Sequence, residues 1–135
     1  MITAVDTNVL LDVFADDPGF ASRSKEWLRA AYDQGAIVAC DIVYAELAPA
    51  FPDRPSLDHA LRMLGATVSP ITTDIAYDAG RRWLRYRRAG GPGKRIITDF
   101  LIGAHALSTA DIFLTRDRGF YRTHFPELGG HTPEL

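Results

Sequence analysis

Short apolar segments of the strand type alternate with longer segments of the helix type along this chain. The strand-like segments lie at residues 2–5, 36–40, 67–71 and 111–114. Between them, apolar side chains recur at a helical spacing, as Trp27 and Ala31 do before the second strand. Strands that alternate with helices form parallel sheets through right-handed crossovers. The sequence therefore predicts an α/β fold with helices on both faces of a mainly parallel sheet.

Cap residues set the expected helix bounds. Helices are predicted at residues 8–14, 22–34 and 42–50, with Asp41 as the N-cap of the third. The N-caps expected for the later helices are Ser56 or Asp58, then Thr73 or Asp74, then Thr98.

Length and composition indicate one ordinary globular domain. The chain has 135 residues, which suits a single domain over residues 1–135. Hydrophobic residues make up 47% of it, and no apolar run approaches the length of a membrane span. Cys40 is the only cysteine, which excludes a disulfide framework. The N-terminal segment lacks the features of a signal peptide, so we expect a cytoplasmic protein that does not associate with a membrane.

Four carboxylates lie near predicted strand ends or helix starts: Asp6, Glu46, Asp99 and Asp117. In a parallel sheet, ligands bind outside the carboxyl ends of the strands, so we expect these side chains to approach one edge of the sheet. An acid in an apolar setting is costly to bury unless something pairs with its charge. Mg²⁺ or Mn²⁺ is a natural partner for convergent carboxylates. The sequence therefore predicts a metal centre.

Basic residues are concentrated just before the third acid. Seven of the 15 Lys and Arg residues lie between positions 81 and 95, with no acid among them. A solvated helix face is the plain interpretation of such a cluster. A basic surface beside an acidic metal centre is also what a phosphodiester nuclease needs to hold its substrate. The residues expected to bind a nucleic-acid backbone are Arg85, Arg88, Lys94 and Arg95.

Four motifs carry a resemblance to a known family. They are Val-Asp-Thr-Asn-Val-Leu-Leu-Asp, Val-Tyr-Ala-Glu-Leu, Ile-Thr-Asp-Phe-Leu-Ile-Gly-Ala-His-Ala and Leu-Thr-Arg-Asp-Arg-Gly-Phe-Tyr. In this order they resemble the acidic motifs of the PIN-domain ribonucleases, and the compact length is most similar to the VapC-type toxins of toxin–antitoxin pairs. The resemblance implies a three-layer PIN-like fold and a metal-dependent endoribonuclease that inhibits translation.

The resemblance also implies site residues and partners. Asp6, Glu46, Asp99 and Asp117 match the catalytic acids, and Thr7, Asn8 and Thr115 match nearby polar positions that bind substrate or orient carboxylates and water. We expect Asp6 and Asp99 to be direct metal ligands, Asp117 to be a ligand of a second metal ion or a water-mediated ligand, and Glu46 to be a ligand or to orient water. The implied partners are RNA, a cognate antitoxin protein and a second copy of the chain, for which Trp27 or Leu61 could supply exposed apolar contacts.

Other interpretations stay open. Taken singly, Asp6 could cap a helix, Asp117 could be a turn residue and Glu46 could face solvent. A non-catalytic RNA-binding or scaffold domain of the same fold is one alternative. A phosphoaspartyl enzyme, such as a haloacid-dehalogenase-like phosphatase, is another, although Asn8 stands where that motif needs a second Asp. Asp12 is expected on a helix surface.

Overall fold

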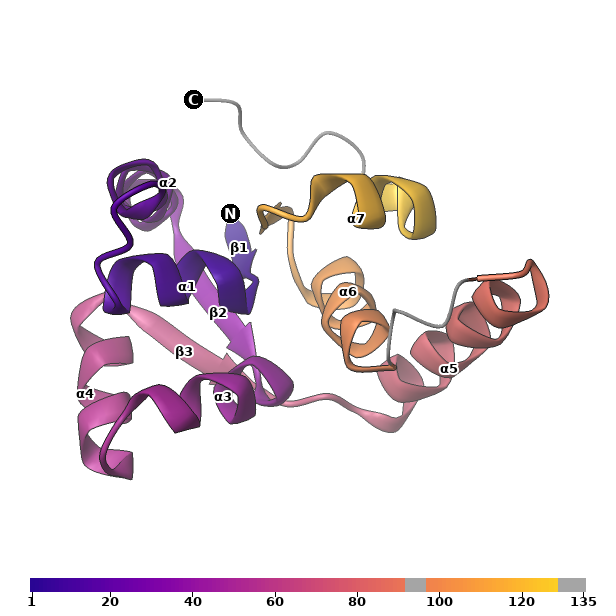
Figure 1. The fold of residues 1–135 in the computed structure, drawn as a ribbon, viewed down its shortest axis with the longest axis horizontal. Helices are drawn as coiled ribbons and strands as arrows, with labels where there is room; N and C mark the ends of the chain where they lie inside the picture. The colour runs from indigo at the N-terminus through magenta and orange to yellow at the C-terminus, as the bar shows by residue number, and fades with distance from the viewer. Residues whose placement is uncertain (92–96, 129–135) are drawn as a thin grey trace.

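All four predicted strands are present, and they pair in parallel. They are β1 (Ile2–Val5), β2 (Ala36–Cys40), β3 (Ala66–Ser69) and β4 (Ile112–Leu114), in the spatial order β3-β2-β1-β4 (Figure 1). The structure is a computed structural model that describes residues 1–91 and 97–128. In the register of the sheet, Ala4 lies opposite Val38 of β2 and Phe113 of β4. The N-terminal strand is thus central, with a neighbour on each side.

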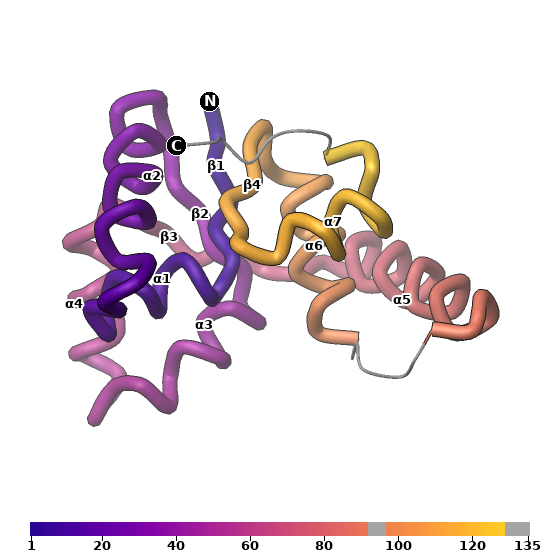
Figure 2. Tube along the Cα trace, turned by 45° about the horizontal axis from the view of Figure 1, so that its top comes forward, coloured from indigo at the N-terminus to yellow at the C-terminus, as the bar shows by residue number. Residues whose placement is uncertain are grey.

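Helices cover the sheet from two sides. They are α1 (Thr7–Phe14), α2 (Ala21–Gln34), α3 (Asp41–Leu47), α4 (Arg54–Met63), α5 (Thr73–Arg88), α6 (Ile97–Thr109) and α7 (Arg118–His124), with the short 3₁₀ helices η1 (Ala48–Ala50) and η2 (Pro126–Leu128). Figures 1 and 2 place α1, α2 and α4 on one side of the strands and α5, α6 and α7 on the other. The predicted three-layer α/β fold is therefore confirmed. No helix in the described ranges is long and apolar enough to cross a bilayer.

An aromatic cluster fixes α7, which the sequence did not predict. Phe120 of α7 packs edge-on against Phe100 of α6, with ring centroids 5.2 Å apart, and Tyr121 packs against Phe113 of β4 at 4.8 Å. Tyr86 of α5 joins the cluster through Phe100. Edge-to-face aromatic pairs stabilise beyond the area they bury. A seven-residue helix is marginal alone, so this packing is what defines it.

Helix α4 begins earlier than predicted. Its N-cap is Asp53, whose side chain accepts a hydrogen bond of 2.8 Å from the Ser56 N–H, rather than Ser56 or Asp58. Pro55 lies in the first turn, where a missing N–H costs the helix nothing. Pro55 therefore helps to start this helix.

Other element bounds differ from the prediction too, by one residue at the starts of α1, α2 and β4, and also at β3 and α5. Strand β3 covers Ala66–Ser69 instead of residues 67–71 because Ala66 already pairs with Ile37, and Pro70 cannot continue the ladder. Helix α5 is capped by Thr72, whose hydroxyl accepts from the Ile75 N–H.

At two further helix starts the expected cap is inside the helix. Asp41 is the first residue of α3, and the N-cap position, Cys40, makes no side-chain cap bond. Thr98 lies within α6.

The residues expected to support a dimer are buried instead. Trp27 and Leu61 are each 4% exposed and belong to the hydrophobic core. Both lie on helices that pack against the sheet, so their apolar side chains fill the interior. They cannot form a contact with a second copy.

Candidate active site

Asp6 lies where the central strand ends and the first helix begins. It is the N-cap of α1, and its Oδ1 accepts a 2.8 Å hydrogen bond from the Thr7 N–H. Its backbone N–H donates to the Leu114 carbonyl, which ties it to the end of β4. The Thr115 hydroxyl donates to Asp6 Oδ2 at 2.7 Å. The helix-cap interpretation of Asp6 is correct, but capping uses only one of its two oxygens.

The position of Asp6 matches the general location of ligand sites in parallel sheets. From β1 the chain winds outward to β2 and β3 on one side, whereas β4 is added on the other side of β1. Crevices at such switch points, outside the carboxyl ends of the strands, are where open α/β sheets bind ligands. Asp6 and Thr115 follow the neighbouring strands β1 and β4 at this switch point, and they are 7% and 1% exposed.

Burial raises the pKa of Asp6 to about 6. The hydrogen bonds from Thr115 and Thr7 oppose this effect, and the negative charges of Glu46 and Asp99 add to it. A carboxyl that is buried and repelled by two other acids is poorly stabilised as an anion. Glu46 and Asp99 are therefore close enough to Asp6 to act on its charge.

Glu46 reaches the site from α3. The residue is exposed, but its Oε1 accepts a 2.7 Å hydrogen bond from the Thr7 hydroxyl. Thr7 thus contacts two acids, since its backbone N–H binds Asp6 and its side chain binds Glu46. The predicted role of Thr7 as a residue that orients carboxylates is consistent with this geometry.

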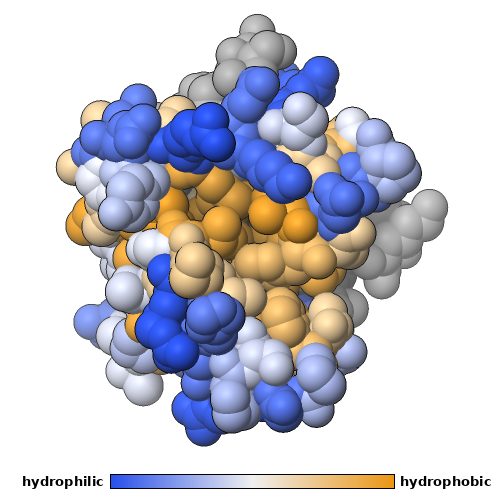
Figure 3. All heavy atoms as spheres, turned by 90° about the vertical axis from the view of Figure 1, so that its left-hand side faces the viewer, coloured by the Kyte–Doolittle hydropathy of each residue, from blue (hydrophilic) through white to orange (hydrophobic). Residues whose placement is uncertain are grey.

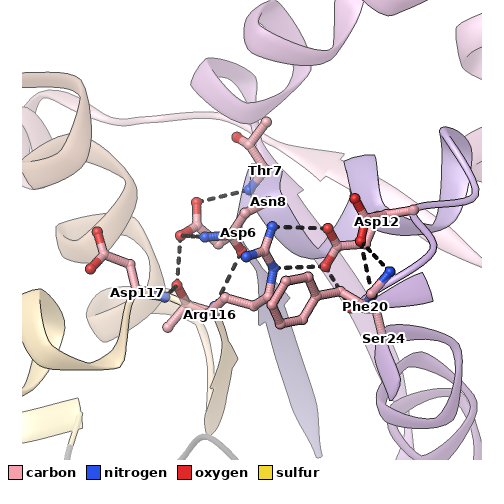
Figure 4. A network of polar contacts seen from close by, with 11 residues as sticks. Asp6, Thr7, Asn8, Asp12, Phe20, Ser24, Arg116 and Asp117 are labelled. Carbon is pink, nitrogen blue, oxygen red and sulfur yellow. Dashed lines mark hydrogen bonds and ion pairs between the residues drawn. The ribbon is translucent and has the colours of Figure 1, made fainter. Parts of the chain in front are cut away.

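Asp99 and Asp117 come from α6 and from the segment between β4 and α7. Asp99 lies in the first turn of α6, half-buried, and its backbone carbonyl accepts from the Tyr121 hydroxyl at 3.4 Å. Asp117, also half-buried, donates its backbone N–H to the Thr115 hydroxyl at 3.0 Å. Because that hydroxyl also binds Asp6, Thr115 connects the first and fourth acids (Figure 4).

The oxygen atoms of the four acids are ligands of the kind that a hard cation prefers. Every candidate ligand offers carboxylate oxygen, and a nearby cation would remove the repulsion that raises the pKa of Asp6. Within residues 1–91 and 97–128, no three Asp, Glu, His or Cys side chains are close enough to hold an ion together. Mg²⁺ usually keeps several waters and binds through one or two carboxylates, so a three-residue cage is not required.

The basic residues of α5 do not act as one group. Arg85 and Arg88 are exposed, and the end of α5 that carries them extends away from the strands (Figure 1). Arg82 instead forms ion pairs with Asp78 at 3.1 Å and Glu127 at 2.6 Å. Lys94 and Arg95 lie outside the described residues.

Sequence reasoning missed an ion pair beside the acids, between a buried acid and an exposed arginine. Asp12, expected on the surface, is 3% exposed and binds Arg116 through two hydrogen bonds of 2.8 and 2.9 Å. The Ser24 hydroxyl also donates to Asp12. Arg116 stands between Thr115 and Asp117, and its backbone N–H donates to the Asn8 side chain at 3.2 Å. The pair joins residues 104 positions apart, a separation that no local pattern could reveal.

Comparison with known proteins places the chain in a family. The sequence profile described as PIN domain matches residues 3–126, and the chain belongs to this family. Proteins with PIN domains are generally nucleases. No curated protein matches the sequence.

Solved structures share the fold. One is VapBC2 from Rickettsia felis bound to a DNA fragment from its promoter, with a TM-score of 0.70 and 19% identity over 90% of this chain and 92% of that one. Another is VapBC-1 from nontypeable Haemophilus influenzae, with a TM-score of 0.70 and 22% identity over 95% of each chain. At these identities the likeness concerns the fold.

Proposed function

We propose that this PIN-domain protein is a metal-dependent endoribonuclease that hydrolyses RNA phosphodiester bonds as the toxin of a VapBC-type toxin–antitoxin pair. The observation that carries the proposal is Asp6, a buried carboxyl at the strand-end crevice on which the charges of Glu46 and Asp99 act. At neutral pH the buried charge of Asp6 opposes folding although its hydrogen bonds cap α1, and a carboxylate of this kind is what metal-assisted phosphodiester hydrolysis uses.

Each polar residue has a task in this mechanism. Asp6 and Asp99 would hold Mg²⁺ or Mn²⁺, with Asp117 as a water-mediated ligand. When bound, the ion supplies a hydroxide near neutral pH and neutralises charge on the attacked phosphate. Thr115 fixes Asp6 Oδ2, and Thr7 fixes the Glu46 carboxylate, which is free at its second oxygen to orient water.

Asn8 supports the nuclease over a phosphoaspartyl enzyme. Its Nδ2 donates to Asp6 Oδ2 at 3.4 Å, and its Oδ1 accepts from the Arg116 N–H. Both ends of this amide are thus engaged in holding the site together. It is not available as the second acid that a haloacid-dehalogenase-like phosphatase needs to move a proton.

RNA would be held by exposed arginines outside the acidic crevice. Arg85 and Arg88 of α5 are exposed, and we propose that they contact the RNA backbone, together with Lys94 and Arg95 of the adjoining segment. Such contacts position a nucleic acid without selecting its sequence, and they weaken as salt rises.

An apolar hollow offers a place for the antitoxin. Figure 3 shows hydrophobic side chains gathered in a hollow on the side of the molecule that carries α2 and α4. A cavity of about 310 Å³ on these helices is lined by Leu28, Tyr32, Met63 and Leu64 with Lys25 and Arg29. Met63 is 72% exposed. We propose that an apolar helix of the antitoxin docks here, because exposed apolar surfaces with a polar rim mark protein contacts. We also propose that the chain forms a homodimer, which light scattering would test.

An RNA cleavage assay tests the nuclease. The wild-type chain should cut RNA in the presence of Mg²⁺ and lose this activity with EDTA, and Asp99→Ala should abolish cleavage with an unchanged circular dichroism spectrum. Binding of RNA without cleavage would indicate a scaffold domain, and release of phosphate from small esters would indicate a phosphatase. Sequencing of RNA ends after expression of both chains would identify the target.

A further inference from the structure

Three arginines from two distant segments line a small pocket beside Asp117. Arg23 comes from α2, whereas Arg116 and Arg118 flank Asp117 in the sequence. The other lining residues are Phe20, Ser24 and Trp27. The pocket has a volume of about 140 Å³. Sites for small organic ligands usually measure about 300 to 1,000 Å³, so this pocket suits a single compact group.

The central arginine is held rigidly. Asp12 binds the Arg116 guanidinium through two hydrogen bonds, and the Phe20 ring lies under it, with the guanidinium carbon 4.0 Å from the ring centroid. The Arg116 backbone is fixed by its bond to Asn8. A guanidinium that is already ordered loses little side-chain entropy when it binds an oxyanion.

The charge of the pocket favours an anion. Every charged side chain that lines the pocket is an arginine. Asp12 is buried behind Arg116, with its oxygens engaged by Arg116 and Ser24. Arg23 is exposed on α2 at the pocket wall. Arginine side chains bind phosphate oxygens in a forked geometry that lysine cannot reproduce.

The pocket and the acidic crevice share one polypeptide turn. Thr115 binds Asp6, Arg116 lines the pocket, and Asp117 follows directly. Figure 4 shows Asp6 and Asp117 on one side of Arg116, with Asp12, Phe20 and Ser24 on the other. An RNA strand whose phosphate is attacked at the acids would therefore pass this pocket with a neighbouring phosphate.

We propose that the pocket formed by Arg23, Arg116 and Arg118 binds a backbone phosphate of the RNA adjacent to the one that is cleaved. This inference rests on the proposed ribonuclease function and adds a binding position to it. The pocket would fix the register of the strand over the acids, while the exposed arginines of α5 contribute attraction at longer range.

Salt-dependent RNA binding tests the pocket. Arg23→Gln removes one guanidinium at an exposed position of α2, and Arg29→Gln, also exposed on α2 but lining other cavities, is the matched control. Both are measured in the Asp99→Ala background with a fluorescent single-stranded RNA between 50 and 200 mM salt. We expect Arg23→Gln to weaken binding several-fold at low salt and to reduce the slope of log K against log salt by about 0.7, the value for one phosphate on a single strand. Arg29→Gln should change neither quantity.

The possible outcomes distinguish a failure of the phosphate pocket from a failure of the proposed ribonuclease function. If wild type cuts RNA but Arg23→Gln and Arg29→Gln bind it equally, the phosphate pocket is wrong and the nuclease stands. If Arg23→Gln weakens only the binding of the antitoxin, the pocket is a protein contact and the proposal is again wrong. If wild type neither binds nor cuts RNA, the proposed function itself fails. Arg23→Lys, which keeps charge without the fork, should restore the salt slope but only part of the affinity.

Discussion

The Asp6 side chain is a charge that the protein buries at a cost. Its pKa is raised to about 6, mainly by burial, from an ordinary value of 3.8. When the pKa of a carboxyl is higher in the folded than in the unfolded protein, the group stabilises the fold at pH values below the pKa of the unfolded state. That contribution is lost as the pH rises through the pKa of the folded state, here about 6. At neutral pH, without a cation, the folded protein therefore holds a destabilising negative charge. This is the stability cost expected of a residue kept for function.

Asp6→Asn should stabilise the metal-free protein at pH 7 and not at pH 4. At pH 4 most of the wild-type carboxyl is protonated in the folded state, so removing its charge changes little. At pH 7 the substitution removes the buried charge, which should raise the free energy of unfolding by at most about 3 kcal/mol. The gain is smaller by the amount that the amide loses in hydrogen bonding to Thr115 and Asn8. Urea unfolding in EDTA at the two pH values measures the difference.

A control variant at an exposed acid and the addition of a divalent cation complete the test of Asp6→Asn. Asp33→Asn, on the exposed face of α2, should not show the same increase between pH 4 and pH 7. Addition of Mg²⁺ at pH 7 should raise the melting temperature of wild type and leave that of Asp6→Asn nearly unchanged, because a ligand stabilises the state that binds it. Equal Mg²⁺ effects on both proteins would contradict a role for Asp6 in holding the ion.

The contact between α6 and the segment after α7 depends on a missing side chain. A Cβ added at Gly103 of α6 would lie 2.5 Å from the Phe125 ring, whereas nothing lies within 4 Å of a Cβ at Gly80 of α5. Gly103→Ala should therefore destabilise the protein by about 1–3 kcal/mol through overpacking. Gly80→Ala should stabilise it by about 0.5–1 kcal/mol because alanine loses less backbone entropy in a helix. Thermal unfolding of the two variants checks the opposite signs, and equal effects would contradict the packing described for α6.

Arg82 connects α5 to the end of the described chain. Besides its ion pairs with Asp78 and Glu127, it donates to the His124 carbonyl, and its guanidinium carbon lies 4.6 Å from the centroid of the Phe125 ring. Arg82→Gln should destabilise the protein by about 1–2 kcal/mol at pH 7, a modest value because Glu127 is half exposed. Urea unfolding of Arg82→Gln and of Arg81→Gln, at an exposed neighbouring position, measures the difference.

The pH dependence of the Arg82 variant separates charge from packing. The hydrogen bonds from Arg82 hold the pKa of Glu127 down to about 2, below its ordinary value of 4.5. An acid whose pKa is lower in the folded than in the unfolded protein stabilises the fold at pH values above the pKa of the unfolded state. This stabilisation is lost as the pH falls toward the pKa of the folded state. The difference between wild type and Arg82→Gln should therefore shrink from pH 5 to pH 2. A constant difference would mean that Arg82 acts through its packing on Phe125 and its hydrogen bond to the His124 carbonyl rather than through its ion pair with Glu127.

Some elements could be predicted from local sequence, and others could not. Strands β1 and β2 were predicted with their observed bounds because their apolar runs end at clear turn and cap residues. Helix α7 was missed because its seven residues, including Gly119, have little helical preference of their own. Its helix is fixed by contacts of Phe120 and Tyr121 with rings far away in the sequence, and local reasoning does not include such contacts.

At the scale of the whole molecule, the proximity of the acids could be predicted from the sequence, whereas the Asp12–Arg116 ion pair beside them could not. The proximity of Asp6 to Glu46 and Asp99 follows from one topological rule, that the carboxyl ends of parallel strands meet at one edge. The Asp12–Arg116 pair follows no such rule, because each residue alone looks like an ordinary surface charge. The basic run before Asp99 looks uniform in the sequence, but its members differ in the structure. Arg82 forms structural ion pairs, whereas Arg85 and Arg88 are exposed.

The apolar hollow and the acidic crevice have separate tasks in the proposed toxin, and one pair of variants can show this. Met63 on α4 and Tyr77 on α5 are both 72% exposed, but only Met63 lines the hollow. Met63→Glu should weaken the binding of the proposed antitoxin at least tenfold, because burying a carboxylate in an apolar contact is costly. Tyr77→Glu, which adds the same charge at the same exposure, should leave that affinity unchanged. Isothermal titration measures both.

RNA cleavage by the same two variants shows whether inhibition depends on the hollow. Both should cut RNA as wild type does, since neither position touches the acids. With antitoxin added, Tyr77→Glu should be inhibited and Met63→Glu should remain active. If the antitoxin bound and inhibited both variants alike, the hollow between α2 and α4 would not be its docking surface, and the exposed apolar side chains there would need another partner, such as a second copy of the chain.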